Sequence, residues 1–300
     1  MNIDDVKKVL VVGSGTMGQQ IATVCIMHGM AVNLYDVKKE LLDAGMERID
    51  RLLGFFVKHH KISEQDRGAA MSRVTAVASI EEAGADVDLV SESIPEDPKL
   101  KGQLFSQLNT ICPERTVFTT NTSTLLPSMF AANTGRPDRF LAFHFHDVRT
   151  TTIVDVMPHP GTSKETVSLV RDFAVRIGQT PIVMERESVG YVFNFMLVSL
   201  FESALTLASN NVASIEDIDR SWMGVMGTMS GPFGIMDSVG LQTVWKVNDF
   251  WARALKDPQK IRNAEFVKAY VDQGRLGVKT QKGFYEYPHP KYRNPDFIRG

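Results

Sequence analysis

A histidine and an aspartate mark the two ends of the stretch HFHDVRTTTIVD, which runs from His144 to Asp155. Histidine has an ordinary pKa near neutrality, so it can accept and release a proton without a large change in its surroundings. A carboxylate bonded to the other ring nitrogen would fix the tautomer of the imidazole and stabilise the imidazolium. The pair therefore predicts proton transfer at His144, with Asp155 as its orienting partner.

Two other interpretations of His144 stay open. His144 and His146 are two positions apart on a predicted strand, so both can face one side and, with Asp147, ligate a metal ion. No further histidine or cysteine follows at a recognisable ligand spacing, and we therefore expect no metal site. The other interpretation is a buried histidine that is bonded only to backbone.

A glycine-rich turn lies near the start of the chain, in VLVVGSGTMGQQIATV. Gly13, Gly15 and Gly18 have the spacing G-x-G-x-x-G directly after a predicted strand and at the start of a predicted helix. The first glycine permits the tight turn, the second lets the backbone approach a pyrophosphate, and the third allows close packing of helix and strand. The turn predicts a dinucleotide site, with Thr16 and Met17 as further contacts.

An acidic residue follows at the end of the second predicted strand. Asp36 stands eighteen residues after Gly18. Its carboxylate can accept hydrogen bonds from the diol of a ribose but would repel a 2′-phosphate. The sequence therefore favours NAD over NADP as the cofactor.

The elements that must hold these residues alternate between apolar strands and helical patterns. This βαβ rhythm predicts an α/β fold with a doubly wound, mostly parallel Rossmann-type sheet. After about residue 185 the strand signals stop and long helical patterns follow. We expect an NAD-binding domain at residues 1–185 and a smaller all-helical domain, for substrate binding and dimerisation, at residues 186–300. The predicted strands are 9–12, 31–35, 88–94, 117–120, 140–145, 153–157 and 181–184.

The composition excludes several classes of protein. The chain has 300 residues, 43% of them hydrophobic, and a formal net charge of −2, so it carries no global field for nucleic acid or an anionic membrane. Cys25 and Cys112 lie far apart and match no metal spacing, which favours free thiols in the cytoplasm. The apolar segment 189–208 contains Asn194 and Glu202, so we expect a core or subunit-interface helix there and no membrane span.

Several stretches along almost the whole chain resemble the short-chain L-3-hydroxyacyl-CoA dehydrogenase family. They are GSGTMG, SESIPEDPKLK, TNTS at residues 120–123, HFHD, VGYVFN, GPFGIMDSVGL and KTQKGFYEY. The resemblance implies an oxidoreductase of fatty acid metabolism. Such an enzyme uses NAD to convert a 3-hydroxyacyl-CoA, such as 3-hydroxybutyryl-CoA, reversibly into its 3-oxoacyl-CoA.

The resemblance also implies roles for particular residues. His144 corresponds to the family's catalytic histidine, Ser123 and Asn194 to its serine and asparagine, and Asp155 to the acidic partner. A hydroxyl and an amide near the reacting oxygen would stabilise the charge that develops there. Cofactor contacts on the nicotinamide side of the cleft are expected from Glu96, Lys101 and Asn121.

This chain departs from the family's pattern around the site. HFHDV stands where HFFNP is usual, and the carboxylate is the shorter aspartate, one residue closer to the histidine. Val189 replaces a proline, and Phe195 replaces an arginine. The substitutions predict a remodelled site, and the separation of His144 and Asp155 decides whether the pair is intact.

Some features have two interpretations. Lys58 and Lys61 match the region near which the family binds the nucleotide of CoA, but lysines at a helix end also complement its dipole. The methionines at 223, 226, 229 and 236 suit an acyl pocket or, as we expect, the core of the helical domain. By analogy with the family, we expect a homodimer.

Two alternative functions stay open. Relatives that act on free hydroxy acids, such as L-gulonate or carnitine dehydrogenases, share this framework, and Arg149 aimed into the cleft would clamp a free carboxylate. The other alternative is a catalytically silent NAD-binding or crystallin-like structural protein. Dehydrogenases of the 6-phosphogluconate type fit less well, because GYVFNFMLVSL lacks the lysine expected on their interdomain helix.

Overall fold

The computed structural model describes residues 1–299 and divides into two compact units. The first unit is residues 1–192, and the second begins at Phe193. The sequence places the domain boundary at residues 185 and 186, in the segment before the first helix of the second unit, and this boundary stays a proposal.

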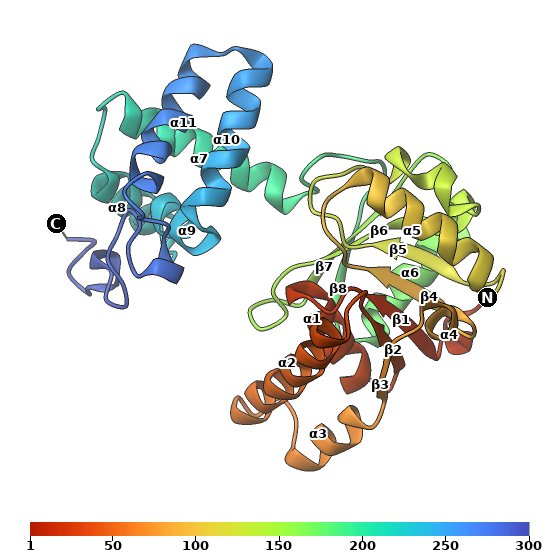
Figure 1. Ribbon diagram of the computed structural model, residues 1–300. Helices are drawn as coiled ribbons and strands as arrows, with labels where there is room; N and C mark the ends of the chain where they lie inside the picture. Colours follow the sequence, from red (N-terminus) through yellow and green to blue (C-terminus); the bar gives the residue numbers. More distant parts are fainter. Residues whose placement is uncertain (300) are drawn as a thin grey trace. The chain divides into compact units, whose positions relative to one another are not determined.

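The first unit is built on one sheet, with the strand order β3-β2-β1-β4-β5-β6-β7-β8 (Figure 1). All neighbouring strands are parallel except β6 and β7, which are antiparallel. This is the predicted doubly wound, mostly parallel sheet. The strands are β1 (Lys8–Val12), β2 (Ala31–Tyr35), β3 (Val74–Val77), β4 (Leu89–Glu92), β5 (Val117–Thr120), β6 (Phe140–Phe145), β7 (Ile153–Pro158) and β8 (Thr180–Val183).

The sequence did not predict strand β3. It is a four-residue edge strand, VTAV, in which only Val74 is fully buried. An edge strand of this length has neither a long apolar run nor a complete alternation of buried and exposed residues, so its sequence signal is weak. Its pairing with β2 supplies the order that the local sequence lacks.

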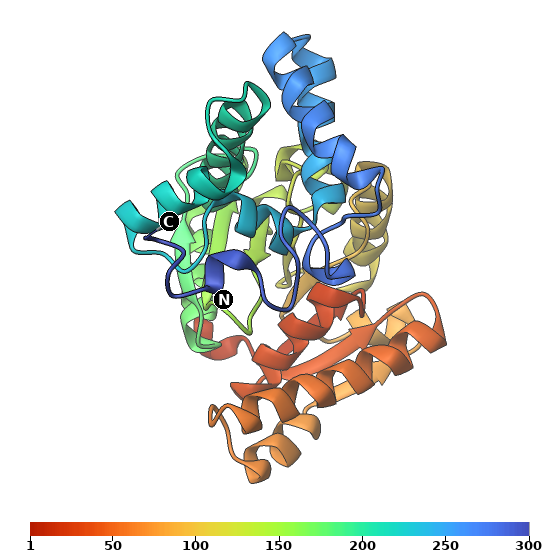
Figure 2. The ribbon, with the colours of Figure 1, turned by 90° about the vertical axis from the view of Figure 1, so that its left-hand side faces the viewer.

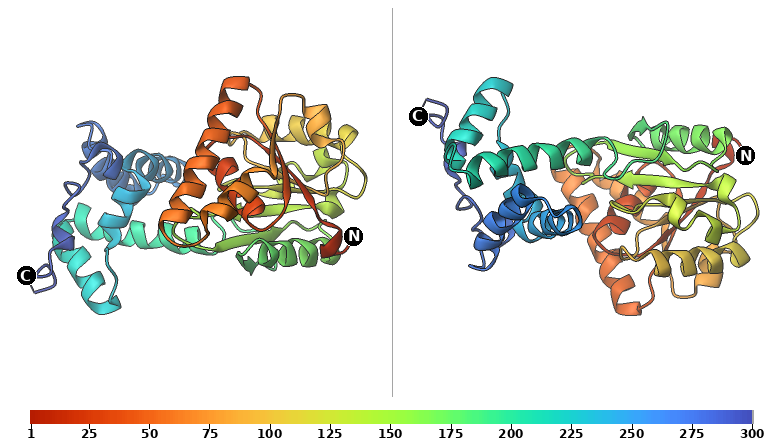
Figure 3. Two further views of the ribbon diagram at one scale, coloured as in Figure 1. Left: turned by 90° about the horizontal axis from the view of Figure 1, so that it is seen from below. Right: turned by 90° about the horizontal axis from the view of Figure 1, so that it is seen from above.

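Helices cover both faces of the sheet (Figure 3). One apolar core joins one face of the strands to α1, α2 and α6, and the other core joins the opposite face to α4 and α5. This explains why the central strands are apolar on both faces. The helices of this unit are α1 (Thr16–Met27), α2 (Lys39–Lys58), α3 (Glu64–Met71), α4 (Ile80–Gly84), α5 (Pro98–Ile111) and α6 (Lys164–Arg176), with short 3-10 helices at η1 (Ile3–Asp5), η2 (Pro127–Met129), η3 (Ala131–Thr134) and η4 (Pro137–Arg139).

The antiparallel pair β6 and β7 sets the geometry around His144. A short loop, residues 146–152, reverses the chain between the two strands. In this register His144 pairs with Asp155, and Phe143 pairs with Val156. Directly opposite residues on an antiparallel pair bring their Cβ atoms to about 4.5–5.5 Å. The shorter spacing in this chain therefore leaves the two side chains as cross-strand neighbours.

The second unit is helical, as predicted. Its helices are α7 (Phe193–Ser209), α8 (Ile215–Met226), α9 (Pro232–Val239), α10 (Leu241–Leu255) and α11 (Pro258–Val271), with 3-10 helices at η5 (Val278–Thr280) and η6 (Lys291–Arg293). Helices α10 and α11 lie side by side (Figures 1 and 2). Within the described residues no helix has the length and apolarity needed to span a membrane.

The four methionines of the predicted stripe, at 223, 226, 229 and 236, divide into two pairs. Met223 and Met236 are buried in its core, as the packing interpretation predicts. Met226 and Met229 are exposed on this unit, at 58% and 89%. The stripe is therefore not a single packing surface.

Candidate active site

His144 and Asp155 form a buried hydrogen-bonded pair. His144 Nδ1 lies 3.1 Å from Asp155 Oδ2. The two residues are 4% and 1% exposed, respectively. The contact follows from the register of β6 and β7, so the aspartate reaches the ring although it is shorter than a glutamate by one methylene.

Asp155 has a second imidazole partner. His146 Nε2 lies 3.2 Å from the same carboxylate oxygen, Oδ2. The rings of His144 and His146 meet edge to face, with centroids 4.8 Å apart. Burial by itself raises the pKa of Asp155, but hydrogen bonds from His144 and then His146, together with the charges of both rings, bring that pKa below its usual range. The carboxylate is thus held in its ionised form.

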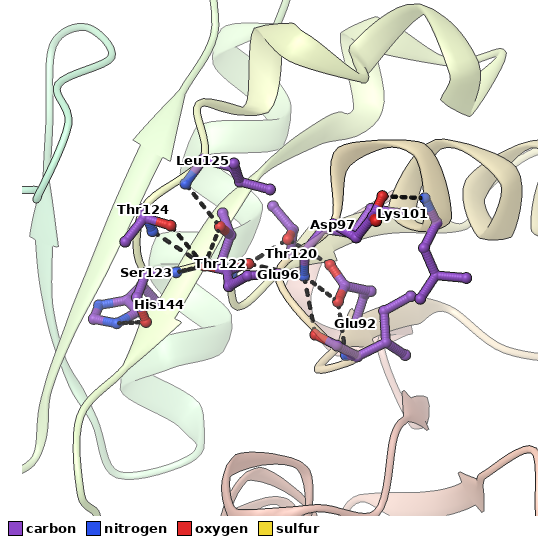
Figure 4. Close-up of polar contacts among 12 residues, drawn as sticks. Glu92, Glu96, Asp97, Lys101, Thr120, Thr122, Ser123, Thr124, Leu125 and His144 are labelled. Atoms are coloured by element: carbon purple, nitrogen blue, oxygen red, sulfur yellow. Dashed lines mark hydrogen bonds and ion pairs between the residues drawn. The ribbon is translucent and has the colours of Figure 1, made fainter. Parts of the chain in front are cut away.

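The other nitrogen of His144 contacts the predicted serine. Ser123 Oγ lies 3.2 Å from His144 Nε2, and Ser123 follows the end of β5 (Figure 4). The ring of Tyr191 stacks on His144, with centroids 4.5 Å apart and an interplanar angle of 10°. Tyr191 in turn donates its hydroxyl to the carbonyl of Thr122. The imidazole is therefore fixed at both nitrogens and on one face.

Glu96 organises the loop that carries Ser123. One carboxylate oxygen, Oε1, accepts from the backbone N–H of Ser123 at 2.6 Å and from Thr122 Oγ1 at 2.7 Å (Figure 4). Burial alone raises the pKa of Glu96. The hydrogen bonds from Thr122 and Ser123 and the charge of Lys101 outweigh burial, and the pKa lies below its usual value. Glu96 thus acts as an ionised anchor for the serine loop.

Lys101 lies beneath this loop. It is 1% exposed, and its Nζ lies 2.5 Å from Glu92 Oε1 and 3.3 Å from Glu96 Oε2. Glu92 also accepts from Thr120 Oγ1 at 2.5 Å. Burial raises the pKa of Glu92, against the opposing effects of Lys101 and these hydrogen bonds. Lys101 was predicted to contact the cofactor; the structure places its ammonium between two carboxylates and not on the lining of the cleft.

A cleft of about 850 Å³ lies along the carboxyl ends of the central strands of the first unit. Its lining includes Gly13 and Gly15 of the predicted glycine turn, Asp36 just after β2, and Asn121 and Ser123 just after β5. The lining residues that the sequence had singled out are Gly13, Gly15, Thr16, Met17, Asp36, Glu96, Asn121 and Ser123. The carboxyl ends of parallel strands are where doubly wound folds bind their ligands.

The three glycines fit a dinucleotide site. A Cβ on Gly13 would lie 2.6 Å from the carbonyl oxygen of Ser93, and one on Gly18 would lie 1.7 Å from that of Gly13. A Cβ on Gly15, at the N-terminus of α1, would meet nothing within 4 Å. Gly13 and Gly18 are therefore required by the fold, whereas Gly15 keeps space clear where a pyrophosphate approaches the helix.

Asp36 lies at the end of β2 and faces the glycine turn. Its Oδ2 accepts from the N–H and the hydroxyl of Ser14, at 2.8 and 2.9 Å. Each carboxylate oxygen has further acceptor capacity, so these bonds orient the side chain without saturating it. Asn121 Oδ1 similarly accepts from the N–H of Phe145, at 2.8 Å, which ties the end of β5 to β6.

The structure replaces Asp147 with Asp155 in the group of residues that could ligate a metal ion. Asp147 is bonded to Arg149, whose Nε donates to it at 2.8 Å. The group that could hold an ion consists instead of His144, His146 and Asp155, with candidate ligand atoms within 4.8 Å of one another. Hydrogen bonds between the two rings and the carboxylate already account for this arrangement.

A second hollow, of about 260 Å³, lies beside α2 in the first unit. It is lined by three arginines, Arg48, Arg51 and Arg149, and by the apolar ring of Phe55. Lys58 and Lys61, predicted near a CoA nucleotide, are exposed at the end of α2 and just beyond it. The guanidinium groups give this surface the chemistry of an anion site.

Asn194 lies in the first turn of α7, in the second unit, and is half-buried. Its assignment as a contact for the substrate stays a proposal.

Two family models match most of the chain. The NAD-binding domain of 3-hydroxyacyl-CoA dehydrogenase matches residues 8–188, and the C-terminal domain of 3-hydroxyacyl-CoA dehydrogenase matches residues 190–287. The chain belongs to the 3-hydroxyacyl-CoA dehydrogenase family. It is an oxidoreductase, and the matched NAD-binding domain makes NAD(H) its cofactor.

Relatives of this 3-hydroxyacyl-CoA dehydrogenase family member are similar along nearly their whole lengths. A probable 3-hydroxybutyryl-CoA dehydrogenase of Bacillus subtilis is 32% identical over 284 residues, which cover 94% of this chain and 98% of the relative. The mitochondrial hydroxyacyl-coenzyme A dehydrogenase of Rattus norvegicus is 33% identical, with coverage of 94% and 91%.

Solved structures of family members and similar enzymes have the same fold. The (S)-3-hydroxybutyryl-CoA dehydrogenase of Ralstonia eutropha has a TM-score of 0.86 at 29% identity, covering 95% of this chain and 100% of its own. A diketoreductase described as acting on dicarbonyl compounds has a TM-score of 0.86 at 36% identity, with coverage of 94% and 99%.

Sequence reasoning about this dehydrogenase missed three residues around the site. Glu92 was not singled out, because its partner Lys101 is recognisable only once β4 and α5 are in place. His146 was linked to a metal and not to Asp155. Tyr191 stood in the recognised VGYVFN stretch, but nothing in its sequence signals a ring stacked on His144.

Proposed function

We propose that this protein catalyses the NAD-dependent, reversible interconversion of a short-chain L-3-hydroxyacyl-CoA and its 3-oxoacyl-CoA at His144. The observation that carries the proposal is the position of His144 Nε2, 3.2 Å from Ser123 Oγ, while its Nδ1 is held by Asp155. Ser123 lines the cofactor cleft, so a hydroxyl beside it would lie near both the cofactor and the imidazole.

The proposed chemistry divides a hydride and a proton between two acceptors. Bound NAD supplies the acceptor for the hydride that leaves C3 with its electron pair. His144 Nε2 takes the proton of the C3 hydroxyl as the carbonyl forms, and returns it in the reverse direction. Asp155 stabilises the imidazolium through Nδ1, while Ser123, with Asn194 as a further proposed contact, donates to the reacting oxygen.

The roles of Glu96 and Lys101 in this proposal are indirect. Glu96 accepts a hydrogen bond from the backbone N–H of Ser123 and so holds that residue in place. Lys101 forms an ion pair with Glu96 and another with the buried Glu92. A serine held through its own backbone retains its position when substrate enters, which keeps the hydrogen bond to the reacting oxygen preorganised.

The surface chemistry of the first unit supports CoA over a free hydroxy acid. Arg149, the candidate clamp for a free carboxylate, is already bonded through its guanidinium to Asp147. It contributes instead to the hollow shared with Arg48 and Arg51, and guanidinium groups suit the phosphates of a CoA nucleotide. The relatives named for hydroxyacyl-CoA substrates agree with this choice.

The oligomeric state and compartment are part of the same proposal. Exposed apolar side chains on the second unit include Phe195 and Met196 on α7 and Phe250 and Trp251 on α10. Large exposed apolar side chains often mark an interface, so we propose a homodimer through this unit. Cys25 and Cys112 are free and buried, which supports the cytoplasm as a reducing compartment.

The decisive assay compares NADH oxidation with acetoacetyl-CoA and with free acetoacetate. We expect turnover with the thioester and little with the free acid. His144→Ala should lower kcat by about 10²- to 10⁴-fold, because it removes the proton acceptor. His289→Ala, at an exposed position in the second unit, is the matched control and should retain the activity.

The similarity to a diketoreductase suggests the second candidate function, the reduction of a dicarbonyl compound. A dicarbonyl compound that carries no CoA, in the same assay, tests it. Turnover of this compound or of acetoacetate at the rate of acetoacetyl-CoA would contradict the CoA assignment. Full activity in His144→Ala would contradict the assigned chemistry for every substrate.

A further inference from the structure

His146 has no place in the proposed mechanism, yet it is bonded to the same buried oxygen as the proposed base. The resemblance puts phenylalanine at this position of the usual pattern, HFFNP, so this imidazole is a departure particular to this chain. The same stretch carries the other departure, an aspartate in place of the longer glutamate. The two changes meet at one atom, Asp155 Oδ2.

We propose that His146 is a positioning residue, which holds the short carboxylate of Asp155 in the orientation that His144 requires. The inference rests on the proposed role of His144 as the base. His146 acts on the reaction through the carboxylate of Asp155, to which its Nε2 is bonded.

The hydrogen bonds of Asp155 carry the argument. Both imidazoles bond to Oδ2 of Asp155. The other carboxylate oxygen, Oδ1, is buried and has no hydrogen-bond partner among the described residues. With His144 as its sole donor, a carboxylate 1% exposed would have one hydrogen bond for its charge and freedom to rotate about its last torsion. The second donor, at 3.2 Å, fixes the plane of the carboxylate.

The surroundings of the carboxylate leave His146 as the second donor. Asp155 lies on β7 between β6 and β8, opposite His144 in the register and beside Ile182. The ring of Tyr191 lies on His144, with its hydroxyl committed to Thr122. His146 also lowers the pKa of Asp155, after His144, and so supports the charged form that stabilises an imidazolium.

The first test is a set of substitutions at residue 146 assayed with acetoacetyl-CoA and NADH. His146→Phe removes the donor and keeps a ring; it should lower kcat by about 10- to 100-fold, as removal of a group that orients a functional histidine does. KM and the affinity for NADH should change by less than about twofold, because the substrate contacts remain.

Rescue by a neutral donor separates positioning from packing. The amide nitrogen of Gln occupies about the place of Nε2, so His146→Gln should restore most of kcat, whereas the shorter His146→Asn should not. If His146→Phe does not fold, the comparison of Gln with Asn carries the test. Equal kcat in those two variants, or kcat unchanged in His146→Phe, would overturn the proposal.

A double-mutant cycle tests whether His146 acts through Asp155. In an Asp155→Asn background, His146→Phe should lower kcat by less than about twofold further, because the carboxylate that it positions is absent. A full multiplicative loss would overturn the proposal. If His144→Ala loses activity while His146→Phe keeps the kcat of the unsubstituted protein, only the inference about His146 fails. If His144→Ala keeps its activity, His144 is not the base, and both the proposed function of His144 and the inference about His146 fail.

Discussion

Asp155 in the first unit and Asp219 in the second are buried aspartates, 1% and 0% exposed, with different kinds of hydrogen-bond donor. Asp155 accepts from two imidazoles. Asp219 accepts from the backbone N–H groups of Phe233 and Gly234, at the start of α9, and from the hydroxyl of Tyr285. One set of donors consists of imidazoles, and the other consists of backbone N–H groups and a phenol hydroxyl.

The pKa values of the two carboxylates shift in opposite directions. Burial raises the pKa of Asp219 to about 6, and its neutral donors only reduce the effect. Burial acts on Asp155 as well, but the two histidines bring its pKa below the usual range. The comparison shows that two imidazole partners bring the pKa of a buried carboxylate below its usual range, whereas backbone N–H and hydroxyl donors leave it raised.

Substitution of each aspartate by asparagine should give the largest contrast. Asp155→Asn should lower kcat by about 10³- to 10⁴-fold, because the neutral amide no longer stabilises the imidazolium and can select the wrong tautomer. The measurement is steady-state NADH oxidation with acetoacetyl-CoA, with circular dichroism to confirm folding.

The matched substitution in the second unit should act on stability and not on catalysis. Asp219→Asn places an amide among hydrogen-bond donors and should cost about 1–3 kcal/mol in the free energy of unfolding. Its folded form should keep kcat within about twofold. A loss of kcat equal to that of Asp155→Asn would remove the distinction between the two carboxylates.

Glu92 and Lys101 extend the comparison to a buried carboxylate paired with a permanent cation. Lys101→Met leaves Glu92 buried without that partner and should lower the free energy of unfolding of the first unit by about 3–5 kcal/mol. Hydrogen exchange at the amides of β4 and β5 measures this loss. Adding Glu92→Gln should recover most of the stability; no recovery would show that the lysine stabilises the unit through something other than this charge.

The pH dependence of stability should give the smallest effect. The folded-state pKa of Asp219, about 6, exceeds the ordinary value of about 3.9, so the folded unit binds more protons between these values and its stability falls as pH rises through them. From pH 5 to pH 7 this group should remove about 1 kcal/mol. Asp155 has the opposite sign: its contribution is present above its unfolded pKa and is lost as pH falls through its lowered folded pKa.

Tryptophan fluorescence in urea measures the pH effect on the second unit selectively, because Trp222, Trp245 and Trp251 all lie there. Asp219→Asn should flatten the dependence between pH 5 and pH 7. A slope of the same size in that variant would assign the effect to other groups.

Much of the fold was predictable because its signals are local. The glycine turn, the apolar strands and the change to helical periodicity each lie within a short window, and the structure has the predicted sheet and helical unit. Strand β3 was not predicted, because its extended conformation depends on pairing with β2 and not on a local sequence signal. The family resemblance supplied the residue types at the site.

The contacts inside the site were less predictable, because they join residues through strand register. His144 was identified from its type, but its contact with Asp155 depends on how β6 pairs with β7. His146 was taken for a possible metal ligand, because sequence gives the side of a strand and not the atom that the side chain reaches. Lys101 was expected at the cofactor, and its burial between Glu92 and Glu96 follows from the packing of α5.

The antiparallel register of β6 and β7 makes the His144–Asp155 separation independent of the length of the turn between the strands. The pair is fixed by cross-strand hydrogen bonds, so residues can be gained or lost beyond His146, within 147–152, while the two side chains remain opposite. A hairpin of this kind lets evolution vary the rim of the site and its proton-transfer centre separately. It also makes this turn a place where an engineer can graft new segments without redesigning the chemistry beneath.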